Sequence, residues 1–152
     1  KHSIPTMSSS TELNINIRDY CDSDFEEVVK LWQPLGLGGA QRGDTIEVIR
    51  QTLNLGGKFL VMEDSPGGNI IGTSWMTIDG RRNYLHHFGI KEEYQGRGLG
   101  KMLLDASLTF AREKGLQLKI EVHQENRRAL DLYASHGFKY LGDYDVYIIR
   151  DI

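Results

Sequence analysis

The 152-residue sequence has one cysteine, three prolines and no excess of positive charge. Cys21 alone excludes an intramolecular disulfide, and one cysteine with scattered histidines offers no ligand spacing for a structural zinc site. Lysine and arginine number 18 against 21 aspartate and glutamate, so the formal net charge is −3. No basic surplus is present to neutralise a phosphate backbone. We therefore expect neither a metal nor a nucleic-acid partner.

Long apolar runs are also missing. No run approaches the roughly 20 residues that span a bilayer, and the N-terminus lacks the apolar core of a signal peptide. Hydrophobic residues make up 39% and charged residues 26%, which excludes a disordered chain. We expect a cytoplasmic protein with no membrane partner. Residues 1–11 are polar and are expected to be a disordered tail, in which Met7 can be the native start, and residues 12–152 are expected to form one domain.

Apolar periodicity and turn residues predict the order of the secondary-structure elements. Helices are expected within 22–33, 44–53, 95–114 and 126–136, with Asp44 or Thr45 capping the second. Strands are expected at 13–17, 58–63, 70–78, 84–90 and 116–122, and two more within 138–149. Central hairpins followed by a strand-helix-strand crossover predict an α/β (α+β) fold, a mixed, mostly antiparallel sheet with helices on both faces. The glycine-rich loop 34–43 is expected to be its most mobile part.

Three alternate glycines, Gly96, Gly98 and Gly100, lie between a predicted strand and the longest predicted helix. Bare backbone at a helix N-terminus exposes several N–H groups, and the helix dipole favours an anion there. A phosphate or pyrophosphate is the ligand that suits this loop. The spacing departs from the dinucleotide-binding fingerprint, and Met102 stands where a P-loop has serine or threonine. A glycine-rich turn needed only for close packing is the alternative.

Two motifs carry a resemblance to a known family. Gln95-x-x-Gly98-x-Gly100 after a strand resembles the acetyl-CoA-binding signature of the GCN5-related N-acetyltransferases (GNAT), and Asn126-x-x-Ala129-x-x-x-Tyr133 is similar to that family's later helix motif. The resemblance implies the GNAT fold, in which the strand before the loop bulges and splays from the next, parallel strand. It implies acetyl-CoA as cosubstrate, with pantetheine along residues 88–90 and pyrophosphate on the amides of residues 96–101. The residues that it implies for the cosubstrate are Phe88, Gly89, Ile90, Gln95, Gly96, Arg97, Gly98, Leu99, Gly100, Lys101, Asn126 and Tyr133.

Two residues compete for the role of catalytic base. Ile120-Glu121-Val122-His123 with Leu132-Tyr133 resembles the ribosomal-protein alanine N-acetyltransferases, which implies Glu121 as base and Tyr133, twelve residues later, as acid. His86 lies on the strand that enters the glycine loop, and its ordinary pKa near 6.5 suits proton acceptance at neutral pH. Alternation places His86 on the same face as Ile90, and His87 on the opposite face unless a bulge shifts the register. Water is the third possible acceptor.

The sequence thus predicts an N-acetyltransferase that moves the acetyl group of acetyl-CoA to a primary amine by direct attack. The acceptor would be a peptide N-terminus or a small-molecule amine, since no motif specifies it. The alternative is a non-catalytic CoA-binding sensor or interaction module of the same fold. An exposed edge strand at residues 144–149 would be able to pair with a second subunit, so both a monomer and a homodimer remain open.

Overall fold

The computed structural model describes residues 14–152, so the tail predicted at residues 1–11 lies outside the described residues. The chain groups into two compact units, one ending at Lys119 and the other comprising Ile120–Ile152. The single domain over residues 12–152 stays a prediction. Within residues 14–152, no helix is both long enough and apolar enough to cross a membrane.

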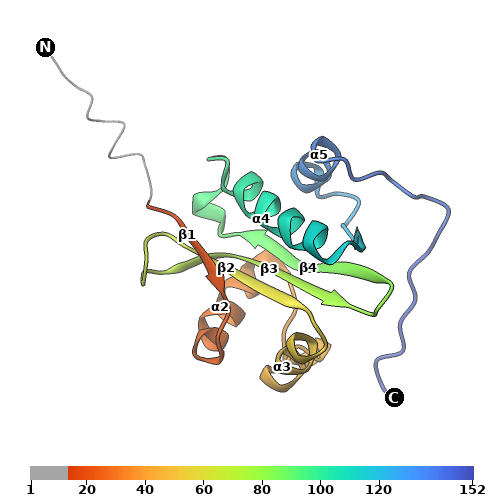
Figure 1. Cartoon of the computed structure of the whole chain (residues 1–152), viewed down its shortest axis with the longest axis horizontal. Coiled ribbons are helices and arrows are strands. Elements are labelled where there is room, and N and C mark those ends of the chain that lie inside the picture. The colour runs from red at the N-terminus through yellow and green to blue at the C-terminus, as the bar shows by residue number, and fades with distance from the viewer. Residues whose placement is uncertain (1–13) are drawn as a thin grey trace, which may run out of the picture. The chain divides into compact units, whose positions relative to one another are not determined.

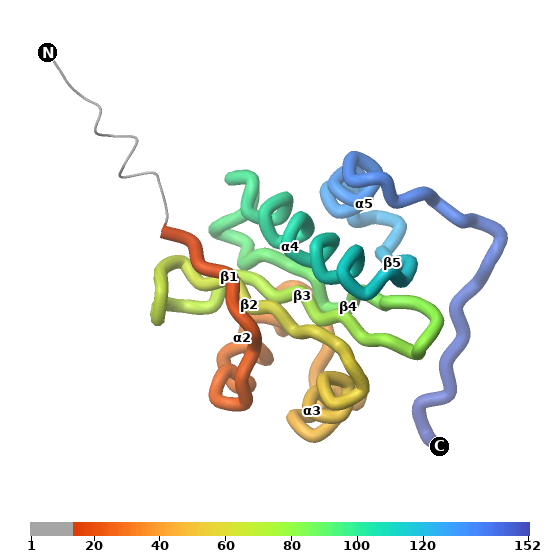
Figure 2. Tube along the Cα trace, viewed as in Figure 1, coloured from red at the N-terminus to blue at the C-terminus, as the bar shows by residue number. Residues whose placement is uncertain are grey.

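The first unit is built on a mixed sheet (Figure 1). Four strands follow one another as antiparallel neighbours: β1 (Asn16–Asp19), β2 (Lys58–Glu63), β3 (Ile70–Ile78) and β4 (Arg82–Ile90). A fifth strand, β5 (Gln117–Ile120), follows β4 in the sheet order and runs parallel to it (Figure 2). The mixed, mostly antiparallel sheet predicted from the sequence is confirmed.

Helices cover both faces of this sheet, as predicted. α2 (Phe25–Leu35) and α3 (Ile46–Asn54) lie on one face, and α4 (Leu99–Lys114) lies on the other (Figure 1). Neighbouring side chains of a strand point to opposite faces, so Phe59 and Val61 of β2 join the core beneath α2 and α3. The residues between and after them, Leu60 and Met62, are also buried. Burial on both faces explains why β2 is an almost continuous apolar run.

Local sequence signals account for the helix ends. The hydroxyl of Thr45 accepts the N–H of Val48 at 3.2 Å, which makes Thr45 the N-cap of α3. Gly36, at φ 70°, ends α2 in the left-handed conformation. The helix therefore continues two residues beyond the predicted end, because Pro34 fits within its last turn. Gly115, also at φ 70°, ends α4 as predicted.

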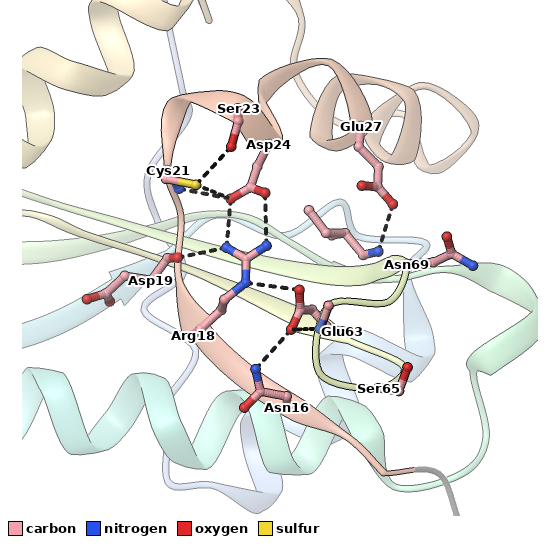
Figure 3. Close-up of polar contacts among 12 residues, drawn as sticks. Asn16, Arg18, Asp19, Cys21, Ser23, Asp24, Glu27, Glu63, Ser65 and Asn69 are labelled. Atoms are coloured by element: carbon pink, nitrogen blue, oxygen red, sulfur yellow. Dashed lines mark hydrogen bonds and ion pairs between the residues drawn. The ribbon is translucent and has the colours of Figure 1, made fainter.

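A charged network fixes β1 against the start of α2 (Figure 3). The guanidinium of Arg18 donates two hydrogen bonds to Asp24, at 2.8 and 2.9 Å, and one to Glu63 at 3.0 Å. Asp24 closes a short 3-10 turn, η1 (Asp22–Asp24), and Glu63 ends β2. The hydrogen bonds from Arg18 lower the pKa of Asp24, against the opposite effect of burial. The pairing therefore keeps both buried carboxylates ionised.

The second unit contains one helix, α5 (Arg127–Ser135), which begins where Asn126 accepts the N–H of Ala129 at 3.2 Å. The prediction of two strands within residues 138–149 is wrong, because the structure has neither helix nor strand there. A strand forms only where its N–H and C=O groups find a partner strand, and the described sheet takes none from this segment. Left-handed backbone at Gly142 and Asp143 also interrupts the extended chain.

Candidate functional site

The glycine loop at the start of α4 forms an open turn of bare backbone. Gly96 and Gly98 have φ of 79° and 80°, and a Cβ added to either would meet no atom within 4 Å. Gly98 is the N-cap of α4 and supplies no side chain to its first turn. In the described part of the chain, no hydrogen bond uses the amides of residues 96–101. These amides and the positive end of a 16-residue helix are suited to an anion.

Hydrogen bonds join this loop to the end of β4 and join the end of β4 to β3. The side-chain amide of Gln95 donates to the carbonyl of Ile90 at 2.8 Å. The backbone N–H of Lys91 donates to the carbonyl of Ile71 at 2.7 Å. A 3-10 turn, η3 (Glu92–Tyr94), lies between β4 and the loop. Gln95 therefore sets the distance between the end of the strand and the start of the helix.

β4 contains the bulge that the resemblance implied. Thr73 pairs with Gly89 and Trp75 pairs with His86, so β4 has one more residue than β3 between these two pairs. The two residues that form the bulge are His87 and Phe88. His87 has φ 48°, a left-handed conformation that is uncommon outside glycine. The hydroxyl of Thr73 donates to the carbonyl of His87 at 2.7 Å, which holds the bulge in place.

The bulge exchanges the two faces of β4, so the prediction that His86 and Ile90 share a face is wrong. Ile90 pairs with Gly72, and a Cβ at Gly72 would meet the side chains of Ile90 and of Leu103 in α4. His86 pairs with Trp75, whose ring belongs to the core beneath α2 and α3. An extra residue reverses the alternation of every side chain that follows it.

Both histidines lie against the same tryptophan. The ring of Trp75 is 6.0 Å from the ring of His86 and 5.2 Å from that of His87. His86 shares a hydrogen bond of 2.8 Å with the hydroxyl of Thr77. Burial, with a smaller contribution from the neighbouring His87, lowers the pKa of His86 to about 4. His86 is therefore neutral at pH 7 and is a weak proton acceptor, and its role as base stays a prediction.

His87 forms a pair that the sequence did not reveal. Its Nε2 lies 2.8 Å from Oδ2 of Asp44, which also accepts the N–H of Gly39 at 2.9 Å. Burial would raise the pKa of Asp44, but the hydrogen bonds from His87 and Gly39 lower it overall. The loop predicted to be the most mobile is thus attached to the bulge of β4. Asp44 carried only a signal for helix capping, and no periodic pattern reveals a bulge.

Comparison with known proteins identifies the family. Residues 25–138 match the model of the Acetyltransferase (GNAT) family. The chain belongs to the GNAT acetyltransferases. It is therefore an acyltransferase, as predicted.

Solved structures show the same GNAT fold. A GNAT-family acetyltransferase from Staphylococcus aureus Mu50 is 24% identical, with a TM-score of 0.72 over 82% of this chain and 83% of that chain. An acetyltransferase from Streptococcus agalactiae 2603 is 21% identical, with a TM-score of 0.73 over 91% of this chain and 93% of that chain. The PaiA N-acetyltransferase from Thermoplasma acidophilum, solved with coenzyme A, is 24% identical, with a TM-score of 0.66 over 82% of this chain and 89% of that chain.

The remaining candidate residues of this GNAT chain belong to its second unit. Glu121 is exposed and follows the last residue of β5. Asn126 caps α5, because its side-chain oxygen accepts the N–H of Ala129. Tyr133 is buried on α5, its ring 5.4 Å from that of Phe138, and burial raises its pKa. The catalytic roles of Glu121 and Tyr133 stay predictions.

A cavity of about 320 Å³ lies in the first unit of the GNAT chain, between α2 and the residues that follow β4. Leu35 lines it, and a Cβ added at Gly89 would lie 3.0 Å from the same Leu35 side chain. The cavity therefore adjoins the strand segment that the family resemblance assigns to pantetheine. Within residues 14–152, no group of three histidine, cysteine, aspartate or glutamate side chains is arranged to hold a metal ion.

Proposed function

We propose that this GNAT chain transfers the acetyl group of acetyl-CoA to a primary amine by direct attack of the amine on the thioester. The observation that carries the proposal is the glycine loop, where unpaired amides and two left-handed glycines surround open space at the start of α4. A pyrophosphate satisfies such amides and lies at the positive end of the helix. The relative solved with coenzyme A supports this choice of ligand.

The strand that leads into the loop suits the rest of the cosubstrate. Pantetheine contains amides that pair with strand backbone, and residues 88–90 form the end of β4, with Phe88 in the bulge and Gly89 and Ile90 directly after it. Gln95 then joins the end of the strand to the loop. One continuous segment, residues 88–101, would therefore contact the acyl end, the pantetheine and the pyrophosphate.

The acceptor amine determines how much help proton removal needs. An α-amine with pKa near 7.7 to 8.0 costs about 1 to 1.4 kcal/mol to deprotonate at pH 7, whereas a lysine-like amine near 10.4 costs about 4.6 kcal/mol. A base in this protein therefore matters most for alkylamines. Tyr133 is the proposed acid for the leaving thiolate, and Glu121, His86 and water are the bases considered from the sequence.

An acceptor screen tests the proposal. Purified protein is incubated with acetyl-CoA and with peptide N-termini, polyamines, aminoglycosides or amino acids, and free thiol release is followed. We expect at least one class of amine to release thiol above the rate without amine, and calorimetry to show acetyl-CoA binding. Binding without transfer to any amine would favour the non-catalytic module. No binding would refute the proposal altogether.

The cellular setting belongs to the same proposal. The one cysteine, Cys21, is exposed and is not needed for a disulfide, which fits a reducing compartment. This and the use of acetyl-CoA support the proposal of a cytoplasmic location. Cell fractionation with an antibody against the protein tests it.

A further inference from the structure

We propose that His87 accepts the proton of the attacking amine and that Asp44 holds its ring in the tautomer that can do so. This inference rests on the proposed acetyl transfer. It assigns the base to His87, which strand alternation without a bulge had placed on the face opposite His86. The pair also explains why a loop with no recognisable motif is attached to the bulge of β4.

The hydrogen bond between the two side chains determines which ring nitrogen is basic. The hydrogen bonds to Asp44 lower its pKa, so the carboxylate is ionised at neutral pH and can only accept a hydrogen bond. Nε2 of His87, 2.8 Å from that carboxylate, must therefore carry the hydrogen. In a neutral imidazole the other nitrogen, Nδ1, then has the free lone pair. A carboxylate beside Nε2 also stabilises the imidazolium that forms when Nδ1 takes a proton.

The bulge places His87 directly before residues 88–90, the segment assigned to pantetheine, and therefore close in the chain to the proposed position of the thioester. Its ring centre lies 4.5 Å from that of Trp32 and 5.2 Å from that of Trp75, so it is held on the face covered by α2 and α3. The side chain is 17% exposed, which leaves it partly open to a small partner. The ring of His87 is therefore fixed by its neighbours and is still reachable by a small molecule.

The backbone around the Asp44–His87 pair leaves room for the imidazole and fixes both residues. Gly38 has φ 36°, and a Cβ there would collide with the imidazole of His87. The N–H of Gly39 fixes the same carboxylate oxygen that binds His87. The hydroxyl of Thr73 holds the carbonyl of His87. A left-handed conformation at a residue with a side chain persists only where neighbouring contacts hold it, and such residues are concentrated at functional sites.

Two titratable side chains, Asp44 and His86, lie beside His87. Asp44 faces it from the loop before α3, and His86 lies 6.3 Å away on β4, between ring centres. The rings that α2 and β3 contribute, Trp32 and Trp75, do not titrate. Burial keeps His86 neutral at pH 7, so His86 adds no positive charge beside His87, whereas Asp44 places a carboxylate against the ring.

The proton and bond changes balance without another reactant. The acceptor ammonium gives one proton to Nδ1 of His87, and the neutral amine attacks the acetyl carbonyl. The N–C bond forms and the C–S bond breaks, with the electron pair leaving on sulfur as thiolate. The nitrogen releases its second proton, which ends on the thiolate. His87 then passes its proton to water, which restores the neutral ring.

The test compares pH–rate profiles of kcat/KM for the best acceptor of the screen. His87→Gln should lower kcat about 100-fold or more and remove the acidic limb, with acetyl-CoA affinity unchanged by calorimetry. Asp44→Asn should lower kcat about tenfold or more and alter that limb, because an asparagine amide can donate to Nε2 and so allow the tautomer that carries its hydrogen on Nδ1. Asp22→Asn is the matched control, since Asp22 is an exposed carboxylate paired with Arg50 at 2.7 Å. We expect it to keep the wild-type profile.

Other outcomes separate this inference from the proposed function. If wild-type protein binds no acetyl-CoA or acetylates no amine, the proposed function fails first. If wild-type is active and His87→Gln keeps its kcat and acidic limb, His87 is not the base. A raised KM with unchanged kcat would mean that the pair only holds the loop. Loss of the limb in Glu121→Gln or His86→Asn instead would also overturn the assignment. Should His87→Gln fail to fold, an unchanged kcat and acidic limb in Asp44→Asn refute the inference, and a change in both supports it.

Discussion

Replacing Gly98 with alanine tests whether the open side of the glycine loop is where the pyrophosphate binds. Gly98 has φ 80°, and the added Cβ would point into space that holds no atom within 4 Å. The free protein therefore suffers no collision, only the cost of left-handed backbone for a residue with a side chain, about 1–2 kcal/mol. For a chain of this size that cost lowers Tm by roughly 2–8 °C. With cosubstrate bound, the same methyl group would occupy the phosphate's approach.

A second glycine provides the matched control. Gly80, in the turn between β3 and β4, has φ 90° and likewise no atom within 4 Å of an added Cβ. Gly80→Ala should thus lower Tm by a similar amount and leave acetyl-CoA affinity unchanged. Gly98→Ala should weaken affinity about tenfold or more, which corresponds to about 1.4 kcal/mol. Calorimetry at fixed salt and thermal unfolding measure the two effects. Equal affinities for the two variants would refute the assignment of the loop to pyrophosphate.

Three further predictions concern other side chains. Tyr133→Phe keeps the buried ring but removes the hydroxyl, so kcat should fall about 100-fold with acetyl-CoA affinity retained; full kcat in steady-state assays would limit Tyr133 to packing. Arg18→Gln leaves Asp24 and Glu63 without their cation and should cost about 3 kcal/mol in urea unfolding, whereas a loss under 1 kcal/mol would contradict this view of the network. Because the pKa of Asp24 is lowered in the folded protein, the ionised carboxylate stabilises the fold fully above the ordinary pKa of 3.8. This stabilisation is lost as the pH falls below 3.8, so the wild-type protein should lose more stability than Arg18→Gln in unfolding series from pH 5 to pH 3.

Most of the fold follows from local signals. The hairpin of β2 and β3 was predictable to the residue, because Asp64 and Asn69 form a turn between two apolar runs: the N–H of Asn69 donates to the Asp64 carboxylate at 2.9 Å. The capping hydroxyl of Thr45 and the terminal glycine of α4 likewise act within one helical turn. Such features depend on residues close in sequence, and a single sequence contains all the information they need.

The features that the sequence did not reveal depend on distant partners. Asp44 and His87 are far apart in the chain, and only the paired strands and the loop after α2 bring them together. Strand alternation fails at the bulge because the extra residue is defined by the pairing with β3, which a pattern in one strand does not contain. Residues 138–149 have apolar residues typical of strands, but strand formation requires a partner edge as well as propensity.

The bulge in β4 allows a side chain to be added to the sheet without repacking the core. Leu85 and Ile90 of β4 are both buried. They are five positions apart in the sequence, and because five is an odd number an uninterrupted strand would place them on opposite faces. The extra residue compensates, so the apolar pattern on either side of it is preserved. A chain lacking one residue here would keep the same hydrophobic pairs and lose one imidazole. Gain or loss of a functional group at this point is therefore a one-codon insertion or deletion that leaves Leu85 and Ile90 on the same face of the sheet.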